Sequence, residues 1–146
     1  MSTQYIRGIE ARDKSIISEF SCIQDCPSLV IHHLMNIGNE ITIFSPEEKM
    51  QATLIPGCLA KVWLIASYRS PQVVFRADSA ANITRGLVTL LVRLFSGATP
   101  RSIMNYDPQF PQVLKLEEIL GTQRRNGFSS MVNTFQLEAQ RFIMRL

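Results

Sequence analysis

The sequence is poor in the residues that many enzymes use for acid–base or metal chemistry. It contains only two histidines, His32 and His33, and three cysteines among 146 residues. A cysteine peptidase or acyltransferase needs a histidine base beside its nucleophile, and both histidines fall on the polar side of one early predicted helix. No Cys-x-x-Cys pair is present, which disfavours a dithiol oxidoreductase.

Long apolar runs and blocks of like charge are also missing. The most apolar stretch, residues 86–95, is interrupted by Arg93 and is far shorter than the ~20 residues that cross a bilayer, so we expect no membrane segment. The 15 basic and 12 acidic residues give a net charge of +3, and the basic ones are spread along the chain. Because nucleic-acid binding usually concentrates positive charge on one patch, no nucleic-acid partner is indicated.

The first residues lack the features of a targeting signal. Residues 1–14 mix basic and acidic side chains without a continuous apolar segment, so we expect neither a secretory signal nor a transit peptide, and a cytoplasmic location. The odd number of cysteines agrees with a protein that has no disulfide framework. No repeat or linker interrupts the chain, and its length suits one domain over residues 1–146, with residues 1–14 as a candidate flexible N-terminus.

The pattern of apolar residues predicts helices before and after a short run of strands. The expected helices lie near 13–21, after Asp25 with Pro27 in the first turn, after a cap at Asp78 or Ser79, from Thr99-Pro100, over 113–120 and along the C-terminal segment. Residues 45–48 are expected to form a polar loop or a short helical turn. The expected strands, rich in β-branched and aromatic residues, are 53–55, 61–68 and 73–75. Helices packed on a small three-stranded antiparallel sheet define an α+β fold.

The helix expected after the sheet has an apolar stripe and a polar side. Leu87, Leu90 and Leu94 recur at core spacing. Arg85 and Thr89 fall on the opposite side of the same helix, so we expect these two side chains to face away from the core.

One cysteine stands at a corner of the chain. Cys58 follows Pro56-Gly57, between the first two predicted strands, and the glycine lets the chain bend sharply there. A buried structural cysteine usually behaves as a small hydrophobe inside a regular element, whereas a loop thiol can react as a thiolate. Lys61 is near enough in sequence to favour the thiolate. A loop cysteine that only packs under the sheet is the alternative interpretation.

The other cysteines and the histidines allow a second hypothesis, a metal site. Cys22 and Cys26 lie four residues apart, but Pro27 marks a helix boundary between them, which favours ordinary thiols without a shared role. His32 and His33 with one of the cysteines would offer ligands for a tetrahedral ion. Adjacent helical residues point in different directions, so the two histidines cannot chelate as a unit.

Four stretches of the chain resemble, in order, the SufE/CsdE family of sulfur-acceptor proteins. They are PGCLAKVW at 56–63, ADSAANITRGLVTLL at 77–91, ATPRSIMNYD at 98–107 and RRNGFSSMV at 124–132. The first is similar to the active-site loop of the family, Gly-Cys-x-Ser-x-Val-Trp. The resemblance runs from about Ser15 to the C-terminus. It implies a small antiparallel sheet with flanking helices, a fold shared with the IscU-type scaffolds.

The resemblance implies a sulfur carrier for iron–sulfur cluster assembly that uses no cofactor and no metal. In such proteins the loop cysteine, here Cys58, accepts sulfur from the persulfide of a pyridoxal-phosphate-dependent cysteine desulfurase of the SufS/CsdA type. The carrier stimulates the desulfurase and passes the sulfur to a SufB-type cluster scaffold, so it is a transfer partner and not a stand-alone enzyme. A metal or iron–sulfur scaffold of the related IscU-like fold is the alternative.

The resemblance also suggests roles for the residues around the loop. The side chains expected to shield the persulfide are Leu59, Val62 and Trp63. Arg124, Asp78 and Lys61 are candidates for contacts with the partner or with the persulfide anion. A helix cap is the simpler role for Asp78.

The chain departs from the family pattern at several positions. Ala60 stands in place of the loop serine, and Ile119 in place of a histidine that often precedes the arginine motif. Cys26 replaces a tryptophan, and Ile41-Thr42 replaces Leu-Pro. Loss of the serine hydroxyl removes one hydrogen bond from the loop, normally worth ~0.5–1.5 kcal/mol net. Loop mobility and partner choice are the properties that these departures would affect.

Overall fold

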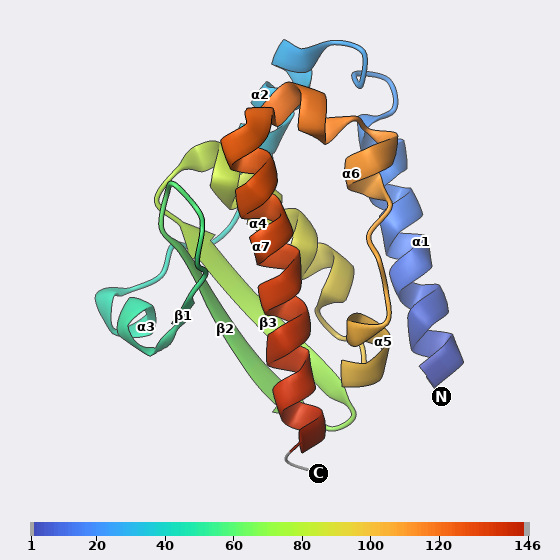
Figure 1. The fold of residues 1–146 in the computed structure, drawn as a ribbon, viewed down its shortest axis with the longest axis vertical. Coiled ribbons are helices and arrows are strands. Elements are labelled where there is room, and N and C mark those ends of the chain that lie inside the picture. Colours follow the sequence, from blue (N-terminus) through green and yellow to red (C-terminus); the bar gives the residue numbers. More distant parts are fainter. Residues whose placement is uncertain (1, 145–146) are drawn as a thin grey trace.

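A three-stranded antiparallel sheet packs against helices in the computed structural model, which describes residues 2–144 (Figure 1). The predicted α+β class is confirmed. The helices are α1 (Ser2–Phe20), α2 (Pro27–Asn39), α3 (Pro46–Gln51), α4 (Asn82–Phe95), α5 (Pro100–Met104), α6 (Phe110–Val113) and α7 (Leu116–Met144). The strands are β1 (Thr53–Leu54), β2 (Val62–Arg69) and β3 (Gln72–Ser79).

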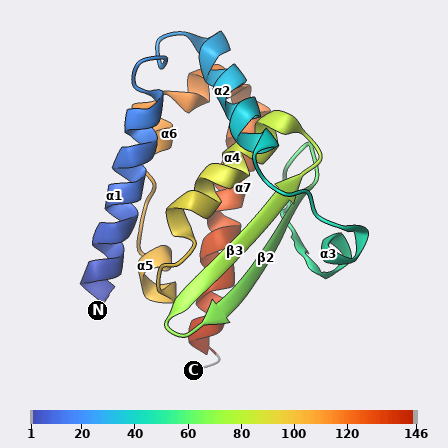
Figure 2. The ribbon, with the colours of Figure 1, turned by 180° about the vertical axis from the view of Figure 1, so that it is seen from behind.

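The sheet has the order β1-β2-β3, and β2 pairs with both neighbours in antiparallel register. Successive side chains of a strand point to opposite faces. Val62 and Leu64 of β2 and Val73 and Phe75 of β3 are buried on one face. Figures 1 and 2 show α4 and α7 on the same side of the sheet, where they cover this apolar face. Burial of each such side chain is worth about 1.5–3 kcal/mol.

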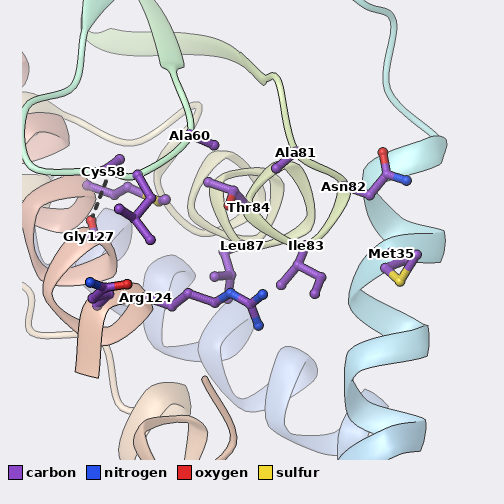
Figure 3. A pocket seen from close by; sticks show the side chains of 13 residues that line it. Met35, Cys58, Ala60, Ala81, Asn82, Ile83, Thr84, Leu87, Arg124 and Gly127 are labelled. Atoms are coloured by element: carbon purple, nitrogen blue, oxygen red, sulfur yellow. Dashed lines mark hydrogen bonds between the residues drawn. The ribbon is translucent and has the colours of Figure 1, made fainter. Parts of the chain in front are cut away.

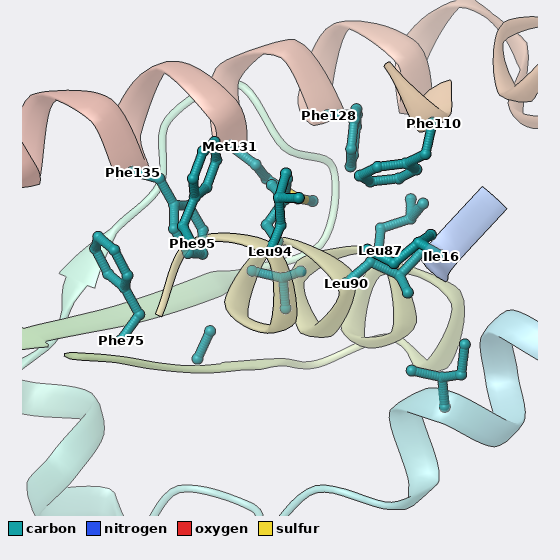
Figure 4. Packing of buried hydrophobic residues seen from close by; sticks show 14 of the residues in the cluster. Ile16, Phe75, Leu87, Leu90, Leu94, Phe95, Phe110, Phe128, Met131 and Phe135 are labelled. Atoms are coloured by element: carbon teal, nitrogen blue, oxygen red, sulfur yellow. The ribbon is translucent and has the colours of Figure 1, made fainter. Parts of the chain in front are cut away.

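Aromatic rings join α4, α7 and the sheet in the core (Figure 4). The ring of Phe135 on α7 lies 4.7 Å from that of Phe75 and 6.0 Å from that of Phe95, centroid to centroid. Leu90 and Leu94 of α4 are fully buried beside them. This packing fixes the position of α7 relative to the sheet, and α7 carries one wall of the site described below.

Helix α2 crosses α4 at close range near the start of α4. A Cβ atom placed on Gly86 would overlap the backbone carbonyl of Leu34, and one on Gly38 would lie 2.7 Å from the carbonyl oxygen of Asn82. Glycine at both positions therefore lets the two backbones touch. The predicted stripe of α2, Val30, Leu34 and Ile37, is buried.

The expected cap at Asp78 or Ser79 is wrong. Both residues still belong to β3, and α4 begins only after Ala81, which is its N-cap and makes no side-chain capping hydrogen bond. The Asp78 carboxylate, 1% exposed, instead accepts hydrogen bonds from the backbone N–H groups of Phe44 and Ser79 at 2.9 and 2.8 Å. It also pairs with Arg85 Nε at 2.9 Å. Asp78 thus ties the loop before α3 to the start of α4.

The polar side expected for α4 is also wrong. Thr89 is buried, and its hydroxyl donates to the carbonyl of Arg85 at 2.7 Å. Arg85 itself is turned toward the buried Asp78. Since α4 packs against the sheet, α2 and α7, most of its circumference is covered.

The helix expected over 113–120 is interrupted. Helix α6 ends at Val113, Lys115 adopts a positive φ of 54°, and α7 begins at Leu116. Gly121, with φ 78° and ψ 169°, then kinks α7 after its first turn. The predicted end of this helix at Leu120 agrees with the kink at Gly121, whereas the apolar spacing misses the break at residues 114–115.

The N-terminal helix is anchored to the rest of the molecule through Asp13. The buried carboxylate of Asp13 accepts hydrogen bonds from the hydroxyl of Tyr106 at 2.6 Å and from the backbone N–H groups of Gln109 and Phe110 at 2.7 and 2.9 Å. Residues 2–14, the candidate flexible N-terminus, lie in α1. Within residues 2–144, no helix combines the length and the apolar character that a membrane span requires.

Candidate functional site

Cys58 lies on the short loop between β1 and β2, which is fixed at both ends. At its start the backbone N–H of Ile55 donates to the carbonyl of Val62 at 2.9 Å. At its end the Lys61 carbonyl accepts from the Ser79 hydroxyl at 2.9 Å. Gly57 has a φ of 80°, which a residue with a Cβ adopts only with strain. The bend that Pro56-Gly57 predicts is therefore present, directly before the thiol.

The thiol of Cys58 is half-buried against helix α7. Its Sγ donates to the carbonyl oxygen of Gly127 at 3.6 Å. A Cβ on residue 127 would lie 3.4 Å from that sulfur, an ordinary van der Waals contact, so the thiol packs closely against the backbone of α7. Burial raises the pKa of the Cys58 thiol, because removing water disfavours the charged thiolate. In this conformation burial therefore favours the neutral thiol over the thiolate.

Cys58 faces a cavity of about 300 Å³ between its loop, the start of α4 and α7 (Figure 3). The lining is mostly apolar: Leu59 and Ala60 come from the loop, Ile83 and Leu87 from α4, Met131 from α7 and Met35 from α2. In the part of the chain that the structure describes, this lining contains no histidine, aspartate or glutamate that could bind a metal ion together with the sulfur.

One cation reaches this cavity. Of the described residues that line it, Arg124 alone carries a charge, and Figure 3 shows its side chain reaching from α7 toward Leu87 and Ile83. Within residues 8–144, Arg124 is not part of an ion pair, whereas its neighbour Arg125 lies 3.8 Å from Glu117. An anion formed on Cys58 would have this guanidinium as its nearest charged neighbour along the cavity wall.

The structure brings together only some of the residues that the sequence suggests. Leu59, 77% exposed, stands at the mouth of the cavity beside Cys58. Val62 is buried in the core on β2. Trp63, the next residue on β2, points to the opposite face of the sheet, where the ammonium of Lys49 lies 4.5 Å from its ring centroid.

The remaining predicted residues, Lys61 and Asp78, contribute backbone and core contacts. The Lys61 side chain is exposed, and the pKa of Cys58 is raised by burial, opposite to the lowering expected from this lysine. Asp78 has its carboxylate in the buried pair with Arg85. In this conformation it holds the end of the sheet and offers no surface to a partner.

Sequence reasoning missed two contacts that α7 makes with the loop. The carbonyl of Gly127 accepts from Cys58, and the hydroxyl of Ser130 donates to the carbonyl of Pro56. The only sequence signal is that residues 127 and 130 are three apart, so they share one side of a helix.

The other thiols and the histidines do not form a metal site. Cys22 is exposed, and Cys26 is the N-cap of α2 with its Sγ 3.5 Å from the Ser28 hydroxyl. His33 pairs with Glu19 at 2.9 Å. Among the side chains described, no three from histidine, cysteine, aspartate and glutamate are grouped to hold a metal ion.

Three SufE-like proteins are similar in sequence to this chain over most of the chain's length. It is 30% identical over 137 residues to SufE-like protein 1, chloroplastic/mitochondrial, of Arabidopsis thaliana, covering 93% of this chain and 37% of that protein. It is 29% identical over 116 residues to an uncharacterized SufE-like protein of Synechocystis (80% and 73% covered) and 28% identical over 130 residues to one of Rhizobium etli (86% and 87%). The chain thus spans well under half of the Arabidopsis relative and most of the other two.

A solved structure shares the fold. The solution structure of a hypothetical protein from Thermus thermophilus superimposes with a TM-score of 0.72 at 16% identity, covering 91% of this chain and 96% of that one. Residues 14–139 match the family described as "SufE: Fe-S metabolism associated domain". This match includes Cys58, the cavity and the part of α7 that lines it. The chain therefore belongs to the SufE family and has a role in iron–sulfur metabolism.

Proposed function

We propose that this chain is a sulfur acceptor that carries sulfane sulfur on Cys58. The donor is the persulfide of a pyridoxal-phosphate-dependent cysteine desulfurase, and the downstream acceptor is an iron–sulfur cluster scaffold. The observation that carries the proposal is the position of Cys58, on a bend of the chain, half-buried, and facing a mostly apolar cavity with one arginine in its wall. Membership of the SufE family supports the same role.

The transfer step needs no oxidant and no metal. The Cys58 thiolate attacks the terminal sulfur of the donor persulfide, so that a new S–S bond forms on Cys58 while the S–S bond of the donor breaks. The donor cysteine leaves as a thiolate and takes up a proton, and the proton of Cys58 goes to solvent. Thiol–disulfide chemistry of this kind depends on the thiolate and on a good leaving group, and it does not require a histidine beside Cys58.

The resting thiol has to leave the cavity to accept sulfur. Its raised pKa keeps it protonated while it is half-buried, and in water a free cysteine has a pKa near ~8.5. Exposure on docking therefore increases the thiolate fraction. Leu59, next to the thiol and 77% exposed, gives the desulfurase an apolar side chain to bind when it draws the loop outward.

Return of the loop would protect the product. A persulfide on Cys58 would enter the cavity beside Leu87 and Met131, away from other thiols in solution. The persulfide is more acidic than a thiol and so is charged near neutral pH, and Arg124 stabilises that charge. Lys61 and Arg124 are also the residues that we propose to contact an acidic surface of the desulfurase. A cytoplasmic location stays a prediction.

The direct test is the mass of the protein after incubation with a cysteine desulfurase and cysteine. The expected result is a gain of one sulfur atom on Cys58, removed by a reductant. Cys58→Ser abolishes the gain, whereas the matched variants Cys22→Ser and Cys26→Ser retain it. Sulfur that appears on Cys26 with Cys58 unmodified would contradict the proposal.

A further inference from the structure

The serine at position 130 of α7 makes an unusual hydrogen bond for a helical residue. Serine and threonine in helices commonly donate to the carbonyl of an earlier turn of their own helix. Ser129 and Thr134 do so, to the carbonyls of Arg125 and Ser130 at 3.2 and 2.8 Å. Ser130 donates instead to Pro56 on the Cys58 loop.

Ser130 also packs directly under the bend of that loop. The atoms nearest to a Cβ built on Gly57 are Ser130 Oγ and Cβ, at 3.8 and 3.9 Å. One turn earlier on the same side of α7, the Gly127 carbonyl accepts from Cys58. Helix α7 therefore holds the loop at two points, one on each side of Gly57.

We propose that Ser130 is a latch that keeps Cys58 in its cavity and limits how often the thiol is exposed. Because the far end of the loop is bonded to Ser79 through the Lys61 carbonyl, the part that has to move lies around Gly57. Exposure of Cys58 requires both contacts with α7 to open. Ser130 is a positioning residue, since it touches the loop and not the reacting sulfur.

The size of the effect follows from the loss of one hydrogen bond. In Ser130→Ala the Pro56 carbonyl, which is at the surface, turns to water in both loop states. The closed state then loses a contact that normally shifts such an equilibrium by roughly two- to tenfold. Since the thiol reacts only from the open state, its reaction rate rises by the same factor.

The first experiment measures alkylation and needs no desulfurase. Iodoacetamide reacts with a thiolate by forming a carbon–sulfur bond and releasing iodide, and peptide mapping by mass spectrometry gives the rate at each cysteine. In Ser130→Ala we expect Cys58 to react roughly two- to tenfold faster than in the wild type. Cys22 and Cys26 serve as internal standards whose unchanged rates show that the fold is intact.

Two matched variants separate the latch from other effects. Ser129→Ala removes a hydroxyl that stays within α7 and should leave the Cys58 rate unchanged. Ser130→Thr retains a hydroxyl at the same position and should stay close to the wild type. An unchanged Cys58 rate in Ser130→Ala, or an equal increase in Ser129→Ala, would overturn the proposal.

The second experiment measures sulfur loading, and only this arm rests on the proposed function. With limiting desulfurase, Ser130→Ala should load Cys58 faster by a factor similar to that seen in alkylation. If alkylation accelerates and no variant loads sulfur, the latch stands and the sulfur-acceptor role fails. If the wild type loads sulfur and Ser130→Ala changes neither rate, the acceptor role stands and the latch fails.

Discussion

Cys26 and Cys58 are both partly exposed thiols, and their pKa values are shifted in opposite directions. Cys26 caps α2 at the surface, and its pKa is lowered, first by the hydrogen bond from the Ser28 hydroxyl and then by the backbone N–H groups of Leu29 and Ser28. Cys58 is half-buried in its loop, and burial raises its pKa. By acidity alone, Cys26 would be the better nucleophile at neutral pH.

Acidity and the proposed carrier role therefore point to different residues. An exposed thiolate reacts with any suitable sulfur compound and would lose a bound sulfane sulfur as readily as it gained one. A half-buried thiol reacts slowly with small reagents, and under the proposed function it would react once the desulfurase exposes it. Cys58 has the cavity that this behaviour needs. The environment of Cys58 therefore fits selective transfer, and that of Cys26 does not.

The largest expected effect on stability and on Cys58 alkylation comes from substitution of Asp78. This residue lies at the end of β3, next to the Cys58 loop. Asp78→Asn keeps the shape of the side chain but removes the charge that pairs with Arg85 at 2.9 Å. Loss of a charge-assisted bond at a buried carboxylate should lower the free energy of unfolding by ~2–3 kcal/mol, measured by urea denaturation. Because Ser79 follows Asp78 and anchors the loop, alkylation of Cys58 should also accelerate while that of Cys26 stays the same.

Glu117→Gln is the matched control for this substitution. Its carboxylate pairs with Arg125 at 3.8 Å and both side chains are exposed, so the same change of charge should alter stability by less than about 1 kcal/mol. Equal destabilisation by the two variants would show that Asp78 acts only through net charge. Acceleration at Cys26 as well as Cys58 would show general loosening of the fold.

The pH dependence of alkylation compares the two thiols directly. Hydrogen bonds that stabilise the Cys26 thiolate favour loss of its proton, so its rate should reach half-maximum below the ~8.5 of a free cysteine. Burial disfavours the Cys58 thiolate, so its midpoint should lie above that value. Peptide-resolved mass spectrometry across a pH series gives both curves, and in urea they should converge.

The pKa shifts of the two thiols also make the stability of the fold depend on pH, in opposite directions. The raised pKa of Cys58 makes the folded state bind its proton more tightly, so this contribution is present below the unfolded pKa and is lost as pH rises through the folded one. The lowered pKa of Cys26 gives a contribution that is present above its unfolded pKa and is lost as pH falls through the folded value. If the pH midpoint for alkylation of Cys58 lay at or below that of Cys26, the opposite pKa shifts of the two thiols would be contradicted.

Local sequence signals located the three strands and the bend at Cys58, although β3 was predicted to end at residue 75 and runs on to Ser79. Pro56-Gly57 marks the corner, and the β-branched runs on either side mark β1 and β2, because turn and strand preferences depend on neighbouring residues. Pro27 marks the first turn of α2 for the same reason. The candidate nucleophile was therefore located from the sequence together with the family motif.

Contacts between distant segments were not predictable in this way. Cys58 bonds to a carbonyl 69 residues away, and Pro56 to a hydroxyl 74 residues away. Asp78 was expected at a helix cap because aspartate is common there, and tertiary packing placed it in a buried ion pair instead. Side chains alternate between the two faces of a strand, so Val62 and Trp63 cannot both face the cavity. The family pattern, which suggested both as shields of the persulfide, contains no such geometric information.

Substitution of Arg124 should have a smaller effect, limited to sulfur loading and persulfide lifetime at Cys58. Arg124→Gln removes the cation from the cavity wall and should slow sulfur loading or shorten persulfide lifetime by about two- to fivefold, the range for a partly exposed charge interaction. Raising the salt concentration should reduce the difference from the wild type. Persulfide is quantified by mass spectrometry after removal of the desulfurase.

Arg125→Gln is its matched control. It changes the net charge equally, but Arg125 faces Glu117 and not the cavity of Cys58. An equal effect of both substitutions would assign the result to the overall charge of the protein. A change in Cys26 alkylation by Arg124→Gln would also count against a local role.

The smallest effect is expected at Ser28, which acts on Cys26 alone. Ser28→Ala removes the hydroxyl 3.5 Å from the Cys26 sulfur, the main cause of its lowered pKa, and should slow alkylation of Cys26 at neutral pH by about twofold, as expected for one long hydrogen bond. The N–H groups at the start of α2 still favour the thiolate, so its midpoint stays below that of Cys58. Sulfur loading of Cys58 should not change, because the two thiols lie in different parts of the fold. A loss of loading in Ser28→Ala would mean that the acidic thiol takes part in transfer, and the contrast between a reactive surface thiol and a protected carrier would then fail.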